Sequence, residues 1–340
     1  MMSPKLTICI PSFNRGPAAL GQVLHTLPLI EPDWEILVLD NCSSINLEGY
    51  QQIELLAKSE PRVRYIRHRE NVGFAKNLLS CFTLANAPYI QINSDEDFSN
   101  TRGVRGAVAT LVEFPQVGLI RGSIAAASGT IPRNSVIYSD QFLNAGRPAL
   151  ADFSLSTNYL SGIIYNRDLL VSMGIFQKFK IGVEGNDTMI AVYPHMYLDI
   201  LVSTFCTVIT SSEVVCLEGE DYHATTSIKA MAEAVPYTFS GRLEQFIGFR
   251  DAFREACGPE ELNDLSLLIH LYLRLVQKYC SLFRIDSFLY IARGLALEPL
   301  QESLRHFLIA ASEIDEFGPV RNLVHKMVQE RFQLCLQTHD

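Results

Sequence analysis

The chain has 340 residues, of which 48% are hydrophobic and 19% charged, and its net charge at pH 7 is −9. A chain of this length and composition can bury a sizeable core and corresponds to about two domains, which excludes a disordered or fibrous protein. The acidic balance argues against nucleic acid as the main partner, because phosphate binding needs a concentrated basic surface.

The eight cysteines stand singly along the chain, and no two of them form a CxxC pair. Several lie inside apolar runs, where a free thiol packs as a small hydrophobic group, so we expect a reduced cytoplasmic protein without a disulfide framework or zinc ribbon. The apolar run before Pro11 is too short for a signal peptide, and no stretch reaches the roughly 18 apolar residues of a transmembrane helix.

Short apolar runs alternate with amphipathic stretches at the start of the chain. Strands are predicted at 6–10, 35–40, 63–66 and 89–92, and helices at 17–28, around 53–56 and through 75–82. Pro11 is expected to end the first strand. The alternation predicts an α/β fold, with a mixed, mostly parallel sheet flanked by helices. Ligands bind such sheets at the carboxyl ends of the strands.

The second half of the chain changes character. Shorter strand candidates lie at 117–121, 160–165 and 204–209. Beyond them, apolar residues recur at helical spacing, so we divide the chain into an α/β domain at 1–225 and an all-helical region at 226–340. The stretch 262–276 is apolar nearly all round, which predicts a helix buried in a docked cap or in a homo-oligomer.

Three adjacent carboxylates, Asp95, Glu96 and Asp97, directly follow the fourth predicted strand. In extended backbone, residues two apart point to the same side, so Asp95 and Asp97 can face one ligand. Mg²⁺ and Mn²⁺ prefer such oxygen ligands and often bind one or two carboxylates together with substrate phosphates. A solvated acidic turn is the alternative, but the position after a buried strand favours a functional site.

Three further polar segments precede this one, and each alone would be an ordinary loop or helix start. They are Ile10–Arg15, Asp40–Ser44 and Asn71–Asn77, and the first two follow the strand residues of the longer stretches Thr7–Arg15 and Ile36–Asn41. In this order and spacing, and followed by Ser94–Asp97, they resemble the motifs of family 2 glycosyltransferases with the GT-A fold. The likeness is strong over the first hundred residues or so and is closest to bacterial transferases of surface-polysaccharide assembly.

The resemblance implies a catalytic domain over 1–225 that binds a nucleoside-diphosphate sugar. The implied pocket is lined by Pro11, Ser12, Asn14, Arg15, Asp40, Asn41, Asn71, Gly73, Lys76, Asn77, Asp95 and Glu96. Asp40 would accept a hydrogen bond from the base, which favours a UDP or dTDP donor. Asn41 stands where the family often has a second aspartate.

The resemblance also implies a divalent metal, Mn²⁺ or Mg²⁺. Asp95 and Asp97 match the family's Asp-x-Asp motif, in which Asp97 would bind the metal and Asp95 would lie near the ribose or the donor sugar. A metal there neutralises the departing diphosphate. His223 is a further candidate metal ligand, although a lone histidine is more often a surface side chain.

Inverting members of the family need a base that deprotonates the acceptor hydroxyl. The nearest match to the family's acidic motif is Glu184-Gly185-Asn186-Asp187. We expect Asp187 to be the base, with Glu184 as the second candidate. The same acids would also fit a helix start, where the helix dipole favours negative charge.

Two other groups of residues could line the site. A basic cluster comprises Arg62, Arg64, Arg67, His68 and Arg69, and could attract phosphate or form a solvated strand face. Three tyrosines, at 159, 165 and 193, fall in the presumed acceptor region, where aromatic rings either stack on sugars or pack in the core.

The leading hypothesis is a metal-dependent inverting transferase that moves a sugar to a hydroxyl of a saccharide or lipid-linked saccharide. Such a role is compatible with peripheral association at the inner face of the plasma membrane. The alternative is a non-catalytic nucleotide-sugar-binding or scaffolding subunit with the same fold. A nucleotidyltransferase ranks third, because its glycine-rich loop with lysine is replaced here by Asn14, Arg15 and Gly16.

Overall fold

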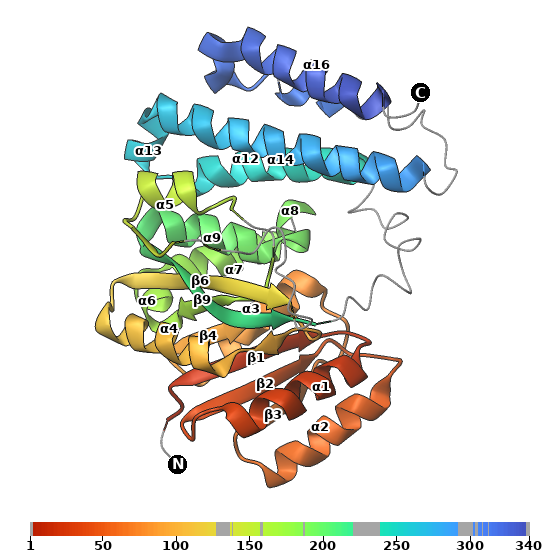
Figure 1. The fold of residues 1–340 in the computed structure, drawn as a ribbon, viewed down its shortest axis with the longest axis vertical. Coiled ribbons are helices and arrows are strands. Elements are labelled where there is room, and N and C mark those ends of the chain that lie inside the picture. The colour runs from red at the N-terminus through yellow and green to blue at the C-terminus, as the bar shows by residue number, and fades with distance from the viewer. Residues whose placement is uncertain are drawn as a thin grey trace. The chain divides into compact units, whose positions relative to one another are not determined.

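The computed structural model describes residues 3–126, 137, 139–156, 159–185, 188–219, 239–291, 302, 305–307, 309–311 and 313–337. The chain divides into two compact units. The first comprises residues 1–186 and 193–222, and the second comprises residues 187–192 and 223–340 (Figure 1). Residues 187–192 thus group with the second unit. The expected division into a domain at 1–225 and a region at 226–340 stays a prediction.

A mixed sheet of nine strands forms the centre of the first unit. Its strands are β1 (Leu6–Ser12), β2 (Trp34–Asp40), β3 (Val63–Arg67), β4 (Tyr89–Ile92), β5 (Phe98–Ser99), β6 (Val117–Ala126), β7 (Gln141–Leu143), β8 (Ile163–Asn166) and β9 (Thr207–Glu218). The order is β3-β2-β1-β4-β8-β6-β9-β5, with β7 paired to β9. Strands β1 to β4 are mutually parallel, whereas β8 runs antiparallel to both of its neighbours. The expected α/β fold is confirmed.

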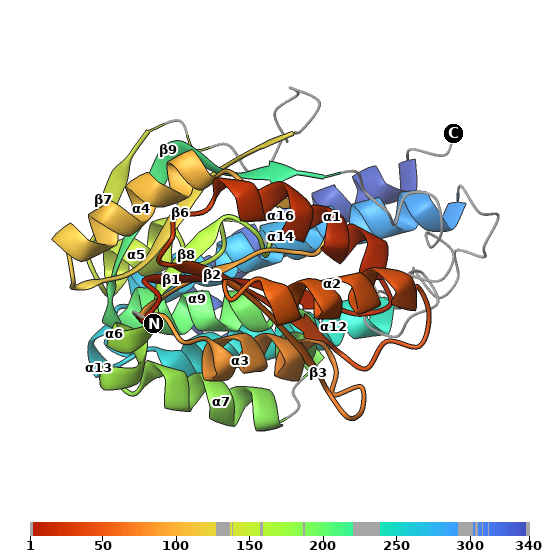
Figure 2. The same cartoon turned by 90° about the horizontal axis from the view of Figure 1, so that it is seen from below.

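Helices cover both faces of this sheet. They are α1 (Gly16–Thr26), α2 (Leu47–Ser59), α3 (Phe74–Leu84), α4 (Thr101–Glu113), α5 (Arg147–Asp152), α6 (Arg167–Ser172), α7 (Ile175–Gly185) and α9 (Pro194–Phe205). Figure 2 shows α1 and α4 on one side of β1 and β2, with α3 and α7 on the other. This two-sided cover explains why the first strands are apolar runs and do not alternate with polar residues.

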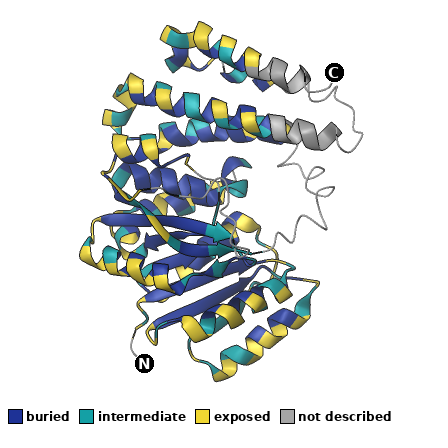
Figure 3. Ribbon diagram, in the orientation of Figure 1, coloured by how far each residue is buried: buried dark blue, intermediate teal, exposed yellow. Residues whose placement is uncertain are grey.

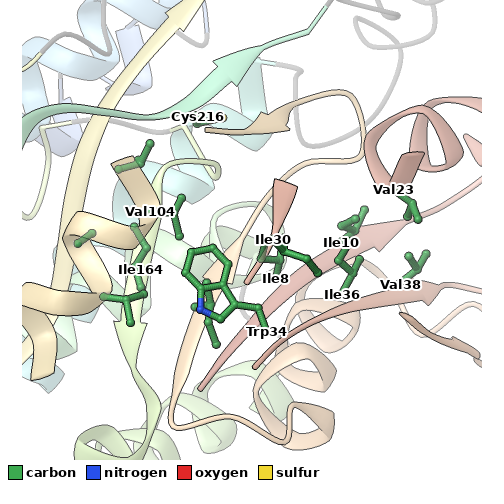
Figure 4. Close-up of a cluster of buried hydrophobic side chains, with 14 of the residues drawn as sticks. Ile8, Ile10, Val23, Ile30, Trp34, Ile36, Val38, Val104, Ile164 and Cys216 are labelled. Atoms are coloured by element: carbon green, nitrogen blue, oxygen red, sulfur yellow. The ribbon is translucent and has the colours of Figure 1, made fainter. Parts of the chain in front are cut away.

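Successive residues of a strand point to opposite faces of the sheet and so pack into the core on both sides. Ile8 and Ile10 of β1 and Ile36 of β2 lie in the same cluster as Val23 of α1 (Figure 4). Cys9 points the other way, and its thiol contacts the carbonyl oxygen of Cys81 on α3 at 3.7 Å. Figure 3 shows the strands buried and the outer faces of α1, α2 and α4 exposed.

The first four strands lie where the sequence predicts them, with one local difference at Pro11. The later candidates at 160–165 and 204–209 are only partly right: β8 begins at Ile163, and residues 204–205 end α9 before β9 begins at Thr207. β1 continues through Pro11 to Ser12 and does not end at the proline. β4 pairs with β1 only as far as Cys9, so one side of Pro11 lies where no ladder hydrogen bond is needed.

The second unit is helical in its described part. Its elements are α8 (Thr188–Val192), α12 (Phe239–Ala256), α13 (Pro259–Asn263), α14 (Leu265–Ile291), η3 (Asp315–Val320) and α16 (Arg321–Gln337). Edge-on aromatic contacts join these helices, such as Phe246 with Tyr279 at 5.7 Å between ring centroids and Phe253 with Tyr272 at 6.5 Å. The expected helical C-terminal region is confirmed. No helix in the described residues is long and apolar enough to cross a membrane.

Candidate active site

The loops that follow β1 and β4 meet through hydrogen bonds at the carboxyl ends of these strands. Ser12, the last residue of β1, donates its hydroxyl to Asp95 Oδ2 at 2.6 Å, and the same hydroxyl lies 2.6 Å from the Tyr50 hydroxyl of α2. The Tyr50 oxygen also accepts the backbone N–H of Arg15 at 3.0 Å. Residues far apart in sequence are therefore fixed at the sheet edge where ligands bind in this fold class.

Arg15 holds two of the three adjacent carboxylates. Its guanidinium lies 3.1 Å from Asp95 Oδ1 and 2.8 Å from Glu96 Oε2. Burial raises the pKa of Asp95 well above its usual range, and the neighbouring Glu96 adds to that rise. Burial would also raise the pKa of Glu96, but hydrogen bonding to Asp95 and the charge of Arg15 outweigh it and lower that pKa. Arg15 therefore contacts both carboxyl groups and balances negative charge on this pair.

This arrangement predicts a strong effect of Arg15→Met on folding. The variant leaves a largely buried carboxylate without its cation, so we expect the free energy of unfolding to fall by about 2–4 kcal/mol at pH 7. The measurement is urea unfolding of both proteins. Arg105→Met is the matched control, because Arg105 pairs with Glu31 on an exposed face and should contribute less than about 1 kcal/mol. Equal losses in the two variants would contradict the buried ion pair.

Asp97 is fully buried, and its partners come from the segment before β8 and from the end of β9. Its Oδ2 accepts the Ser161 hydroxyl at 2.5 Å, and its Oδ1 accepts the Gly219 N–H at 3.1 Å. The Tyr159 hydroxyl lies 3.3 Å from both Asp97 Oδ1 and Glu218 Oε1. The antiparallel pairing of β5 with β9, which sets Phe98 against Leu217, brings the Gly219 amide to this carboxylate.

Burial raises the pKa of Asp97 to about 6, and the charge of Glu96 contributes to the rise. A cation would offset both effects, and hard carboxylate oxygens are the donors that Mg²⁺ and Mn²⁺ prefer. No group of three or more acidic, histidine or cysteine side chains in the described residues is arranged to hold a metal by itself. The metal-binding role expected of Asp97 stays a prediction.

Asp40 is anchored by protein donors at the end of β2. Its Oδ2 accepts the Tyr65 hydroxyl of β3 at 2.9 Å, and its Oδ1 accepts the Ser43 N–H at 2.8 Å. The Arg67 guanidinium lies 3.5 Å from the same carboxylate. The carboxylate is fully buried, and its hydrogen bonds fix the loop after β2. Its expected contact with a nucleotide base stays a prediction.

The loops after β1 and β2 interlock around Asn14. Its side-chain oxygen accepts the N–H of Ser44 at 2.8 Å, and its carbonyl oxygen accepts the Asn46 amide at 2.7 Å. Asn14, Cys42 and Asn46 all have positive φ angles, between 55° and 60°. Such strained backbone persists only where surrounding contacts hold it, and it clusters at functional sites.

The third polar segment is tied to the second by paired asparagines. Asn41 donates its side-chain amide to Asn71 at 2.8 Å and accepts the Val72 N–H at 2.9 Å. Gly73 follows with a φ of +83°, a value that suits glycine where α3 begins. At the first turn of α3, the side chain of Asn77 is buried against the Leu39 carbonyl, whereas Lys76 is exposed.

Of the expected catalytic acids and the candidate histidine ligand, only Glu184 lies among the described residues. Glu184 lies exposed near the end of α7, where it pairs with Lys180 at 3.8 Å. Asp187 and His223 lie outside the described residues. The roles assigned to these three residues stay predictions.

The basic cluster and the tyrosines differ in their surroundings. Arg62 pairs with Glu60, Arg64 with Glu35, and Arg67 with Asp40, so the cluster is largely balanced by acids. Tyr165 is a core residue, and Tyr193 packs against the His195 ring at a centroid distance of 6.3 Å. Only Tyr159 of the three contacts the acidic segment in the described residues.

Sequence reasoning missed several residues that hold the acids. They are Tyr50, Tyr65, Ser161 and Gly219. Gly219 carries the one local signal, a glycine directly after a strand. A side chain there would collide with the Glu96 backbone, so the close approach that brings its N–H to Asp97 requires glycine.

Comparison with known proteins identifies a family whose model matches the part of the chain that contains this cluster. Residues 7–171, nearly half of the chain, match the family model described as "Glycosyl transferase family 2". The matched region contains β1 to β4 and the Asp95–Asp97 segment with Arg15. Residues 7–171, within the first unit, belong to glycosyltransferase family 2.

Individual known proteins also resemble this chain. A putative colanic acid biosynthesis glycosyl transferase of Escherichia coli, WcaA, is 29% identical over 101 residues, which is 29% of this chain and 36% of the relative. The alignment thus spans only about a third of that relative. Mannosyltransferase PcManGT from Pyrobaculum calidifontis, solved with GDP-Man and Mn²⁺, matches all of this chain and 89% of its own at 14% identity and a TM-score of 0.50. That likeness supports the GT-A fold. S. aureus TarS 1–349 in complex with UDP matches 89% of this chain and 91% of its own at 13% identity and a TM-score of 0.47.

Proposed function

We propose that the chain is a metal-dependent, inverting glycosyltransferase that moves a sugar from a nucleoside-diphosphate donor to a hydroxyl of a saccharide or lipid-linked saccharide. The observation that carries the proposal is the buried acidic segment Asp95–Asp97, held by Arg15 and by hydroxyls at the carboxyl edge of the sheet within a family 2 domain. Such buried, charge-perturbed carboxylates are characteristic of catalytic sites.

Each residue of the segment Asp95–Asp97 would have its own role. Asp97 is the carboxylate suited to hold Mn²⁺ or Mg²⁺, because burial and Glu96 disfavour its ionised form until a cation is present. Ser161 and Gly219 fix its two oxygens in place. When bound, the metal would neutralise charge that develops on the departing diphosphate. Asp95 and Glu96, whose negative charge Arg15 balances, would line the part of the site that binds the donor.

The acceptor hydroxyl needs a base that takes its proton as the oxygen attacks the sugar carbon. We assign this role to Asp187, with Glu184 as the second candidate. The donor is proposed to be a UDP, dTDP or GDP sugar. The resemblance supports the first two, and the GDP-Man complex of the mannosyltransferase PcManGT supports the third. The relative named for colanic acid biosynthesis supports a role in bacterial surface-polysaccharide assembly.

A donor screen tests the proposal. The full chain is incubated with UDP, dTDP and GDP sugars, with and without Mn²⁺, and released nucleoside diphosphate and inorganic pyrophosphate are measured separately. We expect one donor class to release nucleoside diphosphate only with metal. That class, at 100 times its dissociation constant, should also stabilise the protein by about 2.7 kcal/mol in a melting assay.

Other outcomes point elsewhere. Pyrophosphate release would favour the nucleotidyltransferase hypothesis. Stabilisation by a donor without turnover, in the presence of saccharide acceptors, would favour the non-catalytic subunit. If no donor either stabilises the protein or is turned over, the chain does not have a nucleotide-sugar site.

A further inference from the structure

Arg121 lies on β6, inside the first unit, and only 3% of its surface is exposed. Its guanidinium donates to the carbonyl oxygen of Tyr159 at 3.0 Å. The next residue of β6, Gly122, donates its backbone N–H to the carbonyl oxygen of Gly162, also at 3.0 Å. Two neighbouring residues of one strand therefore hold both ends of the short segment 159–162.

Segment 159–162 carries the two hydroxyl groups that contact Asp97. Ser161 donates to Asp97 Oδ2, and the Tyr159 hydroxyl lies next to Oδ1. The Ser161 oxygen in turn accepts the backbone N–H of Ser94 at 2.9 Å, which ties the segment to the start of the acidic loop. A shift of this segment would move or release the Asp97 carboxylate.

A buried guanidinium is costly unless a negative charge balances it. The charge of Asp199, on α9, acts on Arg121 and favours its charged form. Asp199 is also only 3% exposed and accepts the Tyr165 hydroxyl at 3.0 Å. Burial raises the pKa of Asp199 to about 7, whereas the Tyr165 hydrogen bond and the charge of Arg121 act to lower it. Such a buried pair contributes little net stability compared with apolar residues of the same volume, so stability alone does not account for it.

We propose that Arg121 is a positioning residue for Asp97: it fixes segment 159–162 from inside the sheet, and that segment holds the metal-binding carboxylate. The charge of Asp199 favours the charged form of the guanidinium. The consequence for catalysis rests on the proposed function, but the positioning itself does not.

The test separates positioning from folding. Arg121→Met alone leaves Asp199 buried and unbalanced, and we expect it to lower the melting temperature. The double variant Arg121→Met/Asp199→Asn removes both charges and keeps an acceptor for the Tyr165 hydroxyl, so it should recover most of that loss. It still lacks the donor to the Tyr159 carbonyl.

The decisive measurement is amide hydrogen exchange in the double variant, without any ligand. The amides of Ser94 and Gly219, which donate to Ser161 and Asp97, should exchange at least about 10-fold faster than in the native protein, relative to the Ile36 amide of β2. In a second measurement, the concentration of Mn²⁺ alone that gives half-maximal thermal stabilisation should rise about 10-fold, because Asp97 is no longer held in place.

Arg167→Met is the matched control. Arg167 donates to the carbonyl oxygen of Phe82 at 2.8 Å, so its loss removes a similar contact that does not hold Asp97. Native exchange at Ser94 and Gly219 in the double variant would overturn the inference, whatever the activity. Absence of donor turnover by the native protein would refute the proposed function. The exchange result would still test whether Arg121 positions Asp97.

Discussion

Asp97→Asn is expected to abolish metal-dependent donor binding and to lower kcat/KM by at least about 1,000-fold, equivalent to about 4 kcal/mol of transition-state stabilisation. The substitution removes the charge that would hold the metal while keeping the shape of a side chain that is fully buried. Calorimetry with the donor class found in the screen, with and without Mn²⁺, measures the first effect, and initial rates measure the second. Asp33→Asn, a change at an exposed aspartate, is the matched control.

The same variant is expected to be more stable than the native protein at alkaline pH in the absence of metal. Burial raises the pKa of Asp97 to about 6, so the folded state binds this proton more tightly than the unfolded state, whose aspartate has a pKa of about 3.9. This contribution to stability is fully present below about pH 4 and is lost as pH rises through 6. Asp97→Asn should therefore gain about 1–3 kcal/mol at pH 8 and little at pH 4.

Urea unfolding at the two pH values measures this gain. Added Mn²⁺ should stabilise the native protein but not the variant. The difference in free energy of unfolding between the two proteins at pH 8 should therefore become smaller or change sign. Native donor binding and turnover in Asp97→Asn, measured with a chelator present, would show that this carboxylate does not hold a metal.

Asp187→Asn is expected to cut the turnover number by at least about 100-fold, within the range for loss of a general base. Donor affinity should change little, because the proposed donor contacts lie at Asp40, Asp95 and Asp97. The experiment pairs calorimetry of the donor with the transfer rate to a competent acceptor. An aspartate at its ordinary pKa of about 3.9 is a weak proton acceptor at neutral pH, so we also expect its pKa in the kcat profile to be raised.

Glu184→Gln is the companion variant. Glu184 is exposed and pairs with Lys180 on α7, so this change should leave both donor affinity and turnover near native values. If Glu184→Gln is the slow variant and Asp187→Asn is not, the base is Glu184. Native rates in both variants would favour the non-catalytic subunit or a base elsewhere in the chain.

The order of buried strands and the four polar segments could be predicted from the sequence. Local apolar runs such as 6–10 and 35–40 identify strands because a strand covered on both faces must be apolar throughout. The polar residues that follow them identify the ligand-binding edge, because parallel strands end at the same side. Ser12, Arg15 and Asp95 therefore come together as the sequence suggested.

The partners of the acids could not be predicted in this way. Ser161 lies 64 residues beyond Asp97 and Gly219 lies 122 residues beyond it, and no local periodicity records which distant loop returns to a given carboxylate. Strand register decides these contacts: the pairing of β5 with β9 sets the Gly219 amide against Asp97. A shift of one residue in that pairing would turn the neighbouring side chains to the opposite face.

The sequence by itself determined the fold class, the edge of the sheet where the candidate site lies, and the acidic segment of that candidate site, because these follow from local hydrophobic patterns and from residues adjacent in the chain. Only the tertiary structure decided how each acid is held: Asp40 by Tyr65, Asp95 and Glu96 by Arg15, and Asp97 by a segment that Arg121 braces. The physical reason is that hydrogen bonds and desolvation depend on which distant side chains share a buried space, which long-range packing sets.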